Sequence, residues 1–150
     1  MPPSLANPYT ITMLNIYLDV DGVLRGCASP KEDIEAFLCY CLDNFSVYWL
    51  TSHCKGGVNY APRALEGILS DDLVKELAEK VQPTDWSTLK TEAIDFDEPF
   101  VWFDDYEGSY EIERLKEHNL EDSFYLVDRN DPNAAKEMLQ YLEERNHESK

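Results

Sequence analysis

The sequence predicts an α/β fold of three layers, in which helices flank a mainly parallel central sheet. Two observations predict it. Short apolar runs typical of buried strands alternate with segments whose apolar residues recur at helical spacing, and three of these runs end in polar side chains. The chain has 150 residues, of which 43% are hydrophobic, enough for one globular core. We therefore expect a single domain over residues 1–150, with its core at about residues 14–142.

The first strand is expected at the apolar run of residues 16–18. A capping box then predicts a helix over residues 30–44, because Ser29 precedes Glu32 by three residues and Pro30 stands at the first helical position. A tight return leads to a second apolar run over residues 46–50, which is expected to be the second strand.

The rest of the chain continues this alternation. Helical spacing predicts two pieces over residues 62–69 and 71–81 that cross back over the sheet, and a short helix around 87–95 with Lys90 in or near its first turn. The remaining expected elements are a strand over 100–103, a helix from 109 to about 119, a strand over 124–127 and a last helix opening at Pro132. The ends, residues 1–12 and 146–150, are proline-rich or polar and are expected to be flexible.

Composition excludes several classes of protein. The formal net charge of −17 and the pI near 4.3 argue against a nucleic-acid partner, because the chain repels phosphate backbones. No apolar stretch reaches the length of a membrane span and the start lacks the layout of a signal peptide, so we expect a cytoplasmic protein without a membrane partner. The cysteines are too scattered for a disulfide framework and are expected to be reduced thiols: Cys27, Cys39, Cys41 and Cys54.

Polar side chains follow three of the expected strands, at the point where each strand ends. They are Asp19 and Asp21, then Thr51 and Ser52, then Asp104 and Asp105. Because the carboxyl ends of parallel strands meet at one edge of a sheet, we expect these side chains to converge there. Carboxylates gathered at one point repel one another unless a cation neutralises them, so Mg²⁺, held or oriented by Asp19, Asp104 and Asp105, is the expected cofactor.

These residue types fit phosphoryl transfer. A carboxylate can attack phosphorus and form an acyl phosphate that water then hydrolyses, and Asp19 is the natural nucleophile. Asp21 can project to the same side, give a proton to the leaving oxygen and later take one from water, a role that crowding by other acids favours. Thr51 supplies a hydroxyl to a phosphoryl oxygen, with Ser52 as its competitor. Lys90 supplies the cation that balances nucleophile and phosphate.

Each motif by itself has another explanation. The acid pair at Asp19 can belong to a turn or to a calcium loop, but the stretch continues with Val23 and Leu24 instead of the further acids that a calcium loop needs. Lys55 and Lys80 compete with Lys90 for the role of the site lysine. A receiver domain of the response-regulator type carries similar residues in a different order: an acid pair, a lone phosphorylated aspartate, a hydroxyl and then a lysine. In this chain a second acid pair comes last, which disfavours that interpretation.

In order along the chain, these motifs resemble those of the haloacid dehalogenase superfamily of phosphatases and phosphotransferases. The aspartate-x-aspartate-glycine motif is Asp19 to Gly22, the hydroxyl at a strand end is Thr51, the lysine is Lys90, and the closing acid pair is Asp104 and Asp105. The resemblance covers about residues 14–142. It implies a Rossmann-like sheet, an aspartyl-phosphate intermediate and bound Mg²⁺, with Asp21 also reaching the metal through its backbone carbonyl.

Only a short segment follows the first motif, and ordinary crossover elements fill residues 52–89, so no cap domain fits. The chain is thus most similar to small capless members, including the phosphatase domain of certain RNA repair proteins. Such members have open sites and often act on macromolecular phosphoesters or borrow a neighbouring subunit as a lid. The implied function is a Mg²⁺-dependent phosphomonoester phosphatase, and the alternative is a catalytically silent binding or regulatory protein of the same fold.

The substrate stays open at this stage. A small phosphorylated metabolite and a phosphoprotein both fit, whereas the acidic charge weakens the case for a nucleic-acid end. Four residues lie on segments that can border an open site: Arg25, His53, Tyr60 and Arg63. Three exposed aromatic residues would suit a contact surface in an oligomer: Tyr9, Tyr106 and Tyr110.

Overall fold

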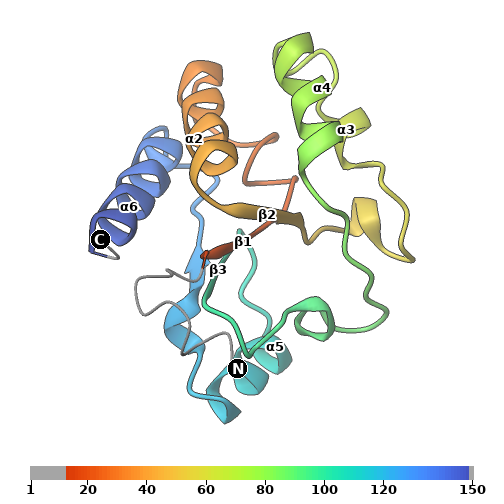
Figure 1. The fold of residues 1–150 in the computed structure, drawn as a ribbon, viewed down its shortest axis with the longest axis vertical. Helices are drawn as coiled ribbons and strands as arrows, with labels where there is room; N and C mark the ends of the chain where they lie inside the picture. Colours follow the sequence, from red (N-terminus) through yellow and green to blue (C-terminus); the bar gives the residue numbers. More distant parts are fainter. Residues whose placement is uncertain (1–12, 149–150) are drawn as a thin grey trace, which may run out of the picture.

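A parallel sheet organises the chain (Figure 1). The computed structural model describes residues 13–148. Within them the sheet has the strand order β2-β1-β3-β4, and every neighbouring pair is parallel. The strands are β1 (Asn15–Leu18), β2 (Ser46–Trp49), β3 (Phe100–Asp104) and β4 (Phe124–Leu126). The predicted three-layer, Rossmann-like α/β fold is confirmed, and no cap is evident over the described residues.

Both faces of the sheet are covered, which explains why the strands read as continuous apolar runs. All residues of β1 and of β3 are buried. One face contributes Ile16, Leu18, Val47, Trp49, Val101 and Phe103 to the larger hydrophobic core. The opposite face contributes Tyr17, Phe100 and Trp102 to a second, smaller core.

Helices form the two outer layers (Figure 1). The larger core is completed by α2 (Lys31–Asn44), α3 (Ala61–Ala64), α4 (Asp71–Lys80) and α6 (Ala134–Glu148). The smaller core is completed by α5 (Ser109–Glu117) and by the segment around the short 3-10 helix η2 (Lys90–Ala93). Two further 3-10 helices, η1 (Ser52–Cys54) and η3 (Glu121–Ser123), follow β2 and precede β4. None of the helices in the described part of the chain is both long and apolar enough to cross a membrane.

The predicted capping box at the start of α2 is wrong, although the helix itself is confirmed. Pro30 occupies the N-cap position of α2, and no side chain caps this end. The Ser29 hydroxyl instead accepts a hydrogen bond of 3.0 Å from the backbone N–H of Ala135, in the first turn of α6. Because α2 and α6 pack side by side, the cap reaches the neighbouring helix rather than its own.

Two helix boundaries differ from the prediction. The piece expected over residues 62–69 is a single turn, α3, and the chain then turns at Gly67, whose φ of +78° interrupts a right-handed helix. At the other end α6 continues to Glu148, and the Asn146 amide donates a hydrogen bond of 2.9 Å to the Tyr40 hydroxyl. The predictions made for residues 1–12, including Tyr9, and for residues 149–150 lie outside the described residues.

Candidate active site

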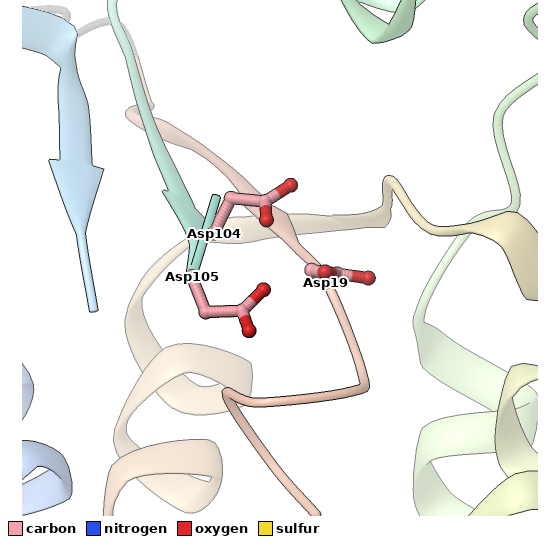
Figure 2. Close-up of side chains that lie close together, drawn as sticks. All are labelled: Asp19, Asp104 and Asp105. Atoms are coloured by element: carbon pink, nitrogen blue, oxygen red, sulfur yellow. The ribbon is translucent and has the colours of Figure 1, made fainter. Parts of the chain in front are cut away.

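The acid-bearing ends of β1 and β3 lie side by side, as parallel pairing predicted (Figure 2). Asp19 directly follows β1, Asp104 is the last residue of β3, and Asp105 comes next. The backbone N–H of Asp19 donates to the Phe103 carbonyl at 3.2 Å, which continues the strand pairing into the site. One carboxylate oxygen from each of the three aspartates lies within 4.8 Å of the others. We call these three side chains the aspartate cluster.

Lys90 places a positive charge beside the aspartate cluster. Its Nζ lies 2.7 Å from Oδ2 of Asp104 and 3.5 Å from Oδ2 of Asp19. Burial by itself would lower the pKa of Lys90, but the charges of Asp19 and Asp104 outweigh it and raise the pKa, so the side chain is an ammonium ion. Lys80 pairs with Glu76, outside the cluster. Lys55 lies over the ring of Trp86, and among the described residues no ion pair joins it to the aspartate cluster.

The two acids that end β3 have different partners. Asp104 is buried, and burial together with the charge of Asp19 raises its pKa to about 6, although Lys90 and the Tyr106 backbone N–H oppose this. Asp105 forms an ion pair with Arg129, which follows β4, and Nη2 of Arg129 lies 2.9 Å from Oδ2 of Asp105. Burial and the Asp104 charge nevertheless raise the pKa of Asp105. Three carboxylates thus face two cations, Lys90 and Arg129, so the ionised cluster keeps an excess of negative charge.

Gly22 allows the loop after β1 to approach the aspartate cluster. Its φ of +81° lies in the left-handed region, and a Cβ at this position would overlap the Asp105 carboxylate and lie 2.6 Å from Nη2 of Arg129. The motif glycine therefore has two physical reasons here: the turn of the backbone and the close passage of the Asp105–Arg129 ion pair.

Asp21 faces a separate set of partners. Its Oδ1 accepts a hydrogen bond of 2.6 Å from Nε of Arg25, and its Oδ2 lies 2.9 Å from Nε2 of His53. Partial burial would raise the pKa of Asp21, but the hydrogen bonds and charges of Arg25 and His53 outweigh it and lower the pKa. The Asp21 carboxylate is thus ionised. The sequence suggested that neighbouring acids would favour its protonated form, but Arg25 and His53 determine the direction of its pKa shift.

The predicted hydroxyl residues lie at the end of β2. Thr51 is buried, and its hydroxyl accepts a long hydrogen bond of 3.4 Å from the His53 backbone N–H, while Ser52 is exposed. Within the described residues, no hydrogen bond or ion pair links Thr51 or Ser52 to the aspartate cluster. Thr51 is tied to the site instead through its backbone carbonyl, which accepts a hydrogen bond of 3.2 Å from the Trp86 indole N–H.

Sequence reasoning missed Arg129, which pairs with Asp105, and Glu111, which binds the backbone of η2. It named Arg25 and His53 only as residues bordering the site. A local signal existed for Arg25, which stands four residues after Asp21, but none for Glu111 or Arg129, whose partners are distant in the chain.

The aspartate cluster suits a hard divalent cation. Its donors are all carboxylate oxygens, the ligand type that Mg²⁺ prefers, and they are close enough to share one ion. The pKa values of Asp104 and Asp105 are raised, and Lys90 and Arg129 neutralise the three carboxylates only in part, so the cluster attracts a cation. Comparison of the chain with protein-family models, curated proteins and solved structures found no match.

Proposed function

We propose that this protein is a Mg²⁺-dependent phosphohydrolase of the haloacid dehalogenase type, which cleaves phosphate monoesters through an aspartyl-phosphate on Asp19. The observation that carries the proposal is that Asp19 lies beside two further carboxylates, those of Asp104 and Asp105, and beside the ammonium ion of Lys90, whose Nζ is 3.5 Å from Oδ2 of Asp19. A nucleophile, a balancing cation and oxygen ligands for a metal are the parts that phosphoryl transfer needs.

Asp19 is held in an orientation suited to attack. Its Oδ1 accepts a hydrogen bond of 2.8 Å from the Val20 backbone N–H, and Oδ2 faces Lys90. In the proposed first step a carboxylate oxygen of Asp19 forms a bond to phosphorus and the ester P–O bond breaks. The alkoxide leaves with the bonding electron pair and takes a proton from water. Water then attacks the same phosphorus, the bond to Asp19 breaks, and phosphate leaves.

Charge is the main obstacle to this reaction, because an anionic nucleophile approaches an anionic phosphoryl group. Lys90 places one positive charge beside both Asp19 and Asp104. Mg²⁺, when bound by Asp19, Asp104 and Asp105, would supply further neutralisation of the phosphoryl oxygens. Arg129 holds the Asp105 carboxylate, and this ion pair orients one of the proposed ligands.

Asp21 fits the second half of the reaction better than the first. A carboxylate that Arg25 and His53 keep ionised can take a proton from the attacking water, as a general base does. Donating a proton to the leaving group requires the protonated form, which these partners disfavour. An Asp21 that is held ionised also favours the alternative function, a silent protein of this fold that binds a cation or a partner without turnover.

Hydrolysis of para-nitrophenyl phosphate, with and without Mg²⁺, tests the proposal. We expect metal-dependent release in the wild type and none in Asp19→Asn, while Asp43→Asn, which removes an exposed acid on α2, keeps the wild-type rate. Equal rates in the wild type and Asp19→Asn would exclude Asp19 as nucleophile. If folded wild-type protein releases nothing but binds beryllofluoride, the substrate is more demanding; if it does neither, the silent alternative holds.

A further inference from the structure

An open pocket of about 420 Å³ lies directly beside the aspartate cluster. Four aromatic residues line it together with Asp19, Lys90 and Asp104: Trp86, Trp102, Tyr106 and Tyr110. Tyr106 and Tyr110 are 74% and 75% exposed, an unusual amount of aromatic surface to leave in water. We call these four side chains the aromatic wall.

Two residues of the aromatic wall, Tyr106 and Trp86, are positioned by contacts near the site. The Tyr106 backbone N–H donates to Oδ1 of Asp104 at 3.1 Å. Its ring lies against Gly108, where a Cβ would come within 3.3 Å of Cε1 of Tyr106. The Trp86 ring lies 6.0 Å from Nζ of Lys90, and its indole N–H donates to the Thr51 carbonyl. A group bound against these rings would therefore be fixed relative to Asp19.

The charges that line the pocket restrict the chemical class of ligand that it can bind. Its lining carries four carboxylates, from Asp19, Asp104, Asp105 and Glu111, and the cation of Lys90. Two further cations contact the lining, because Arg129 pairs with Asp105 and Lys55 lies over the Trp86 ring, so the carboxylates still outnumber the cations. Lys90 already pairs with two of the carboxylates, and the whole chain has a net charge of −17. Anionic groups beyond the reacting phosphate would be repelled, so polyphosphates and nucleic-acid ends fit poorly. An uncharged group with a flat apolar face fits best.

We propose that the aromatic wall binds a planar, uncharged aromatic leaving group, so that the substrates are aryl phosphates of the phosphotyrosine type. The inference rests on the proposed phosphatase function. In such a substrate the ring is bonded directly to the ester oxygen, so it lies close to the reacting phosphorus. This fits the aromatic wall, because Trp86 lies near Lys90, and Lys90 pairs with Asp19. When the P–O bond breaks, the phosphoryl group passes to Asp19 and the aryl oxygen leaves with the bonding electron pair and then takes a proton.

A nucleoside monophosphate is the competing planar ligand. Its base is separated from phosphorus by the ribose, whereas the ring of an aryl ester is separated from phosphorus only by the ester oxygen. The Trp86 ring lies 6.0 Å from Nζ of Lys90, the group that pairs with Asp19. The geometry therefore favours the aryl ester, and the nucleotide becomes an outcome of the test.

Binding of two unreactive phosphonates tests the pocket without any turnover. Benzylphosphonate and cyclohexylmethylphosphonate differ in ring planarity, and calorimetry with Mg²⁺ present measures the affinity of both. We expect benzylphosphonate to bind roughly 10-fold more tightly, as two stacking contacts would give. The preference should disappear in Tyr106→Ala/Tyr110→Ala, and persist in Tyr106→Phe/Tyr110→Phe and in Ile68→Ala, which removes an exposed apolar side chain outside the pocket. Equal binding of the two phosphonates to the wild type, or an undiminished preference in the double alanine variant, would overturn the inference.

Measurements of turnover then distinguish the aryl-phosphate assignment from the phosphatase function on which it rests. We expect kcat/KM to be higher for phosphotyrosine than for adenosine 5′-monophosphate, with this ratio reduced in the double alanine variant. A neutral phosphotyrosine peptide assayed beside free phosphotyrosine distinguishes a protein side chain from a small aryl phosphate. Preference for the nucleotide overturns the aryl assignment but leaves the phosphatase standing. Aromatic binding without hydrolysis of any monoester removes the phosphatase and with it the substrate assignment.

Discussion

The carboxylate of Glu111, on α5, holds the backbone of Lys90 in place, since its Oε2 accepts a hydrogen bond of 2.7 Å from the Lys90 N–H. Its Oε1 accepts two more from Thr91, one from the N–H at 3.1 Å and one from the hydroxyl at 2.8 Å. A single side chain from another element thus anchors the first turn of η2. The ammonium of Lys90 reaches Asp104 and Asp19 from this anchored backbone.

Glu111 is therefore expected to act as a positioning residue. Glu111→Ala should lower kcat/KM for phosphate monoesters by about 10-fold, because displacement of a charged group by a fraction of an ångström weakens its action in the site. Glu111→Gln, which keeps an acceptor oxygen, should recover part of the loss. The exposed neighbour Glu113 provides the control Glu113→Ala. Steady-state kinetics should show a fall in kcat with a rise in KM, and a loss of thermal stability without any kinetic change would contradict the positioning role.

Gly22 and Gly67 form a matched pair for testing close approach. Both have positive φ, +81° and +78°, so alanine should cost about 1–2 kcal/mol of stability at either position. Only at Gly22 would the new Cβ overlap the Asp105 carboxylate, whereas nothing lies within 4 Å of it at Gly67. Denaturant unfolding of the two variants should therefore show a larger loss for Gly22→Ala. Equal losses of unfolding free energy in the two variants would mean that the Asp105–Arg129 ion pair can move away from the new Cβ without destabilising the fold.

A cation bound to the aspartate cluster should stabilise the folded state. Mg²⁺ at about 100 times its dissociation constant adds roughly 2.7 kcal/mol to the free energy of unfolding. Thermal unfolding should show this gain in the wild type and in Asp43→Asn, and should show little of it in Asp105→Asn. The two variants change the net charge equally, so nonspecific screening would affect both alike. An identical Mg²⁺ response in all three proteins would place the ion outside the cluster.

The raised pKa of Asp104 predicts how stability depends on pH in metal-free protein. Below about pH 4 the carboxyl group is protonated in both the folded and the unfolded state. Between pH 4 and the folded-state pKa of about 6, the unfolded chain ionises first, so the free energy of unfolding falls as pH rises. Asp104→Asn lacks this penalty. Its stability relative to wild type should rise by roughly 2–3 kcal/mol across this range. Chemical denaturation with a chelator present measures it, and a constant difference from pH 4 to pH 7 would contradict the raised pKa.

Local pattern was sufficient for the elements and for part of the candidate site. The apolar runs before Asp19 and Asp104 predicted neighbouring buried strands, and parallel pairing then required their ends to meet. Helical spacing likewise predicted α2, α4 and α6. The prediction failed at two places. The helix expected over residues 62–69 ends as the single turn α3, and Gly67, with a positive φ, lies just beyond its C-cap Leu65. Ser29 accepts a hydrogen bond from α6 instead of capping α2.

The sequence by itself determined the α/β class, the strands and the gathering of acids at one sheet edge, because apolar periodicity and strand direction are properties of short segments. Tertiary structure alone decided which partner each acid receives. Arg129 pairs with Asp105, Arg25 and His53 hold Asp21, and Glu111 anchors Lys90. Most of these partners are far apart in the chain and meet only through the paths of loops and helices between them. Burial and these contacts together shift the pKa values of Asp21 and Asp105, and no local pattern encodes them.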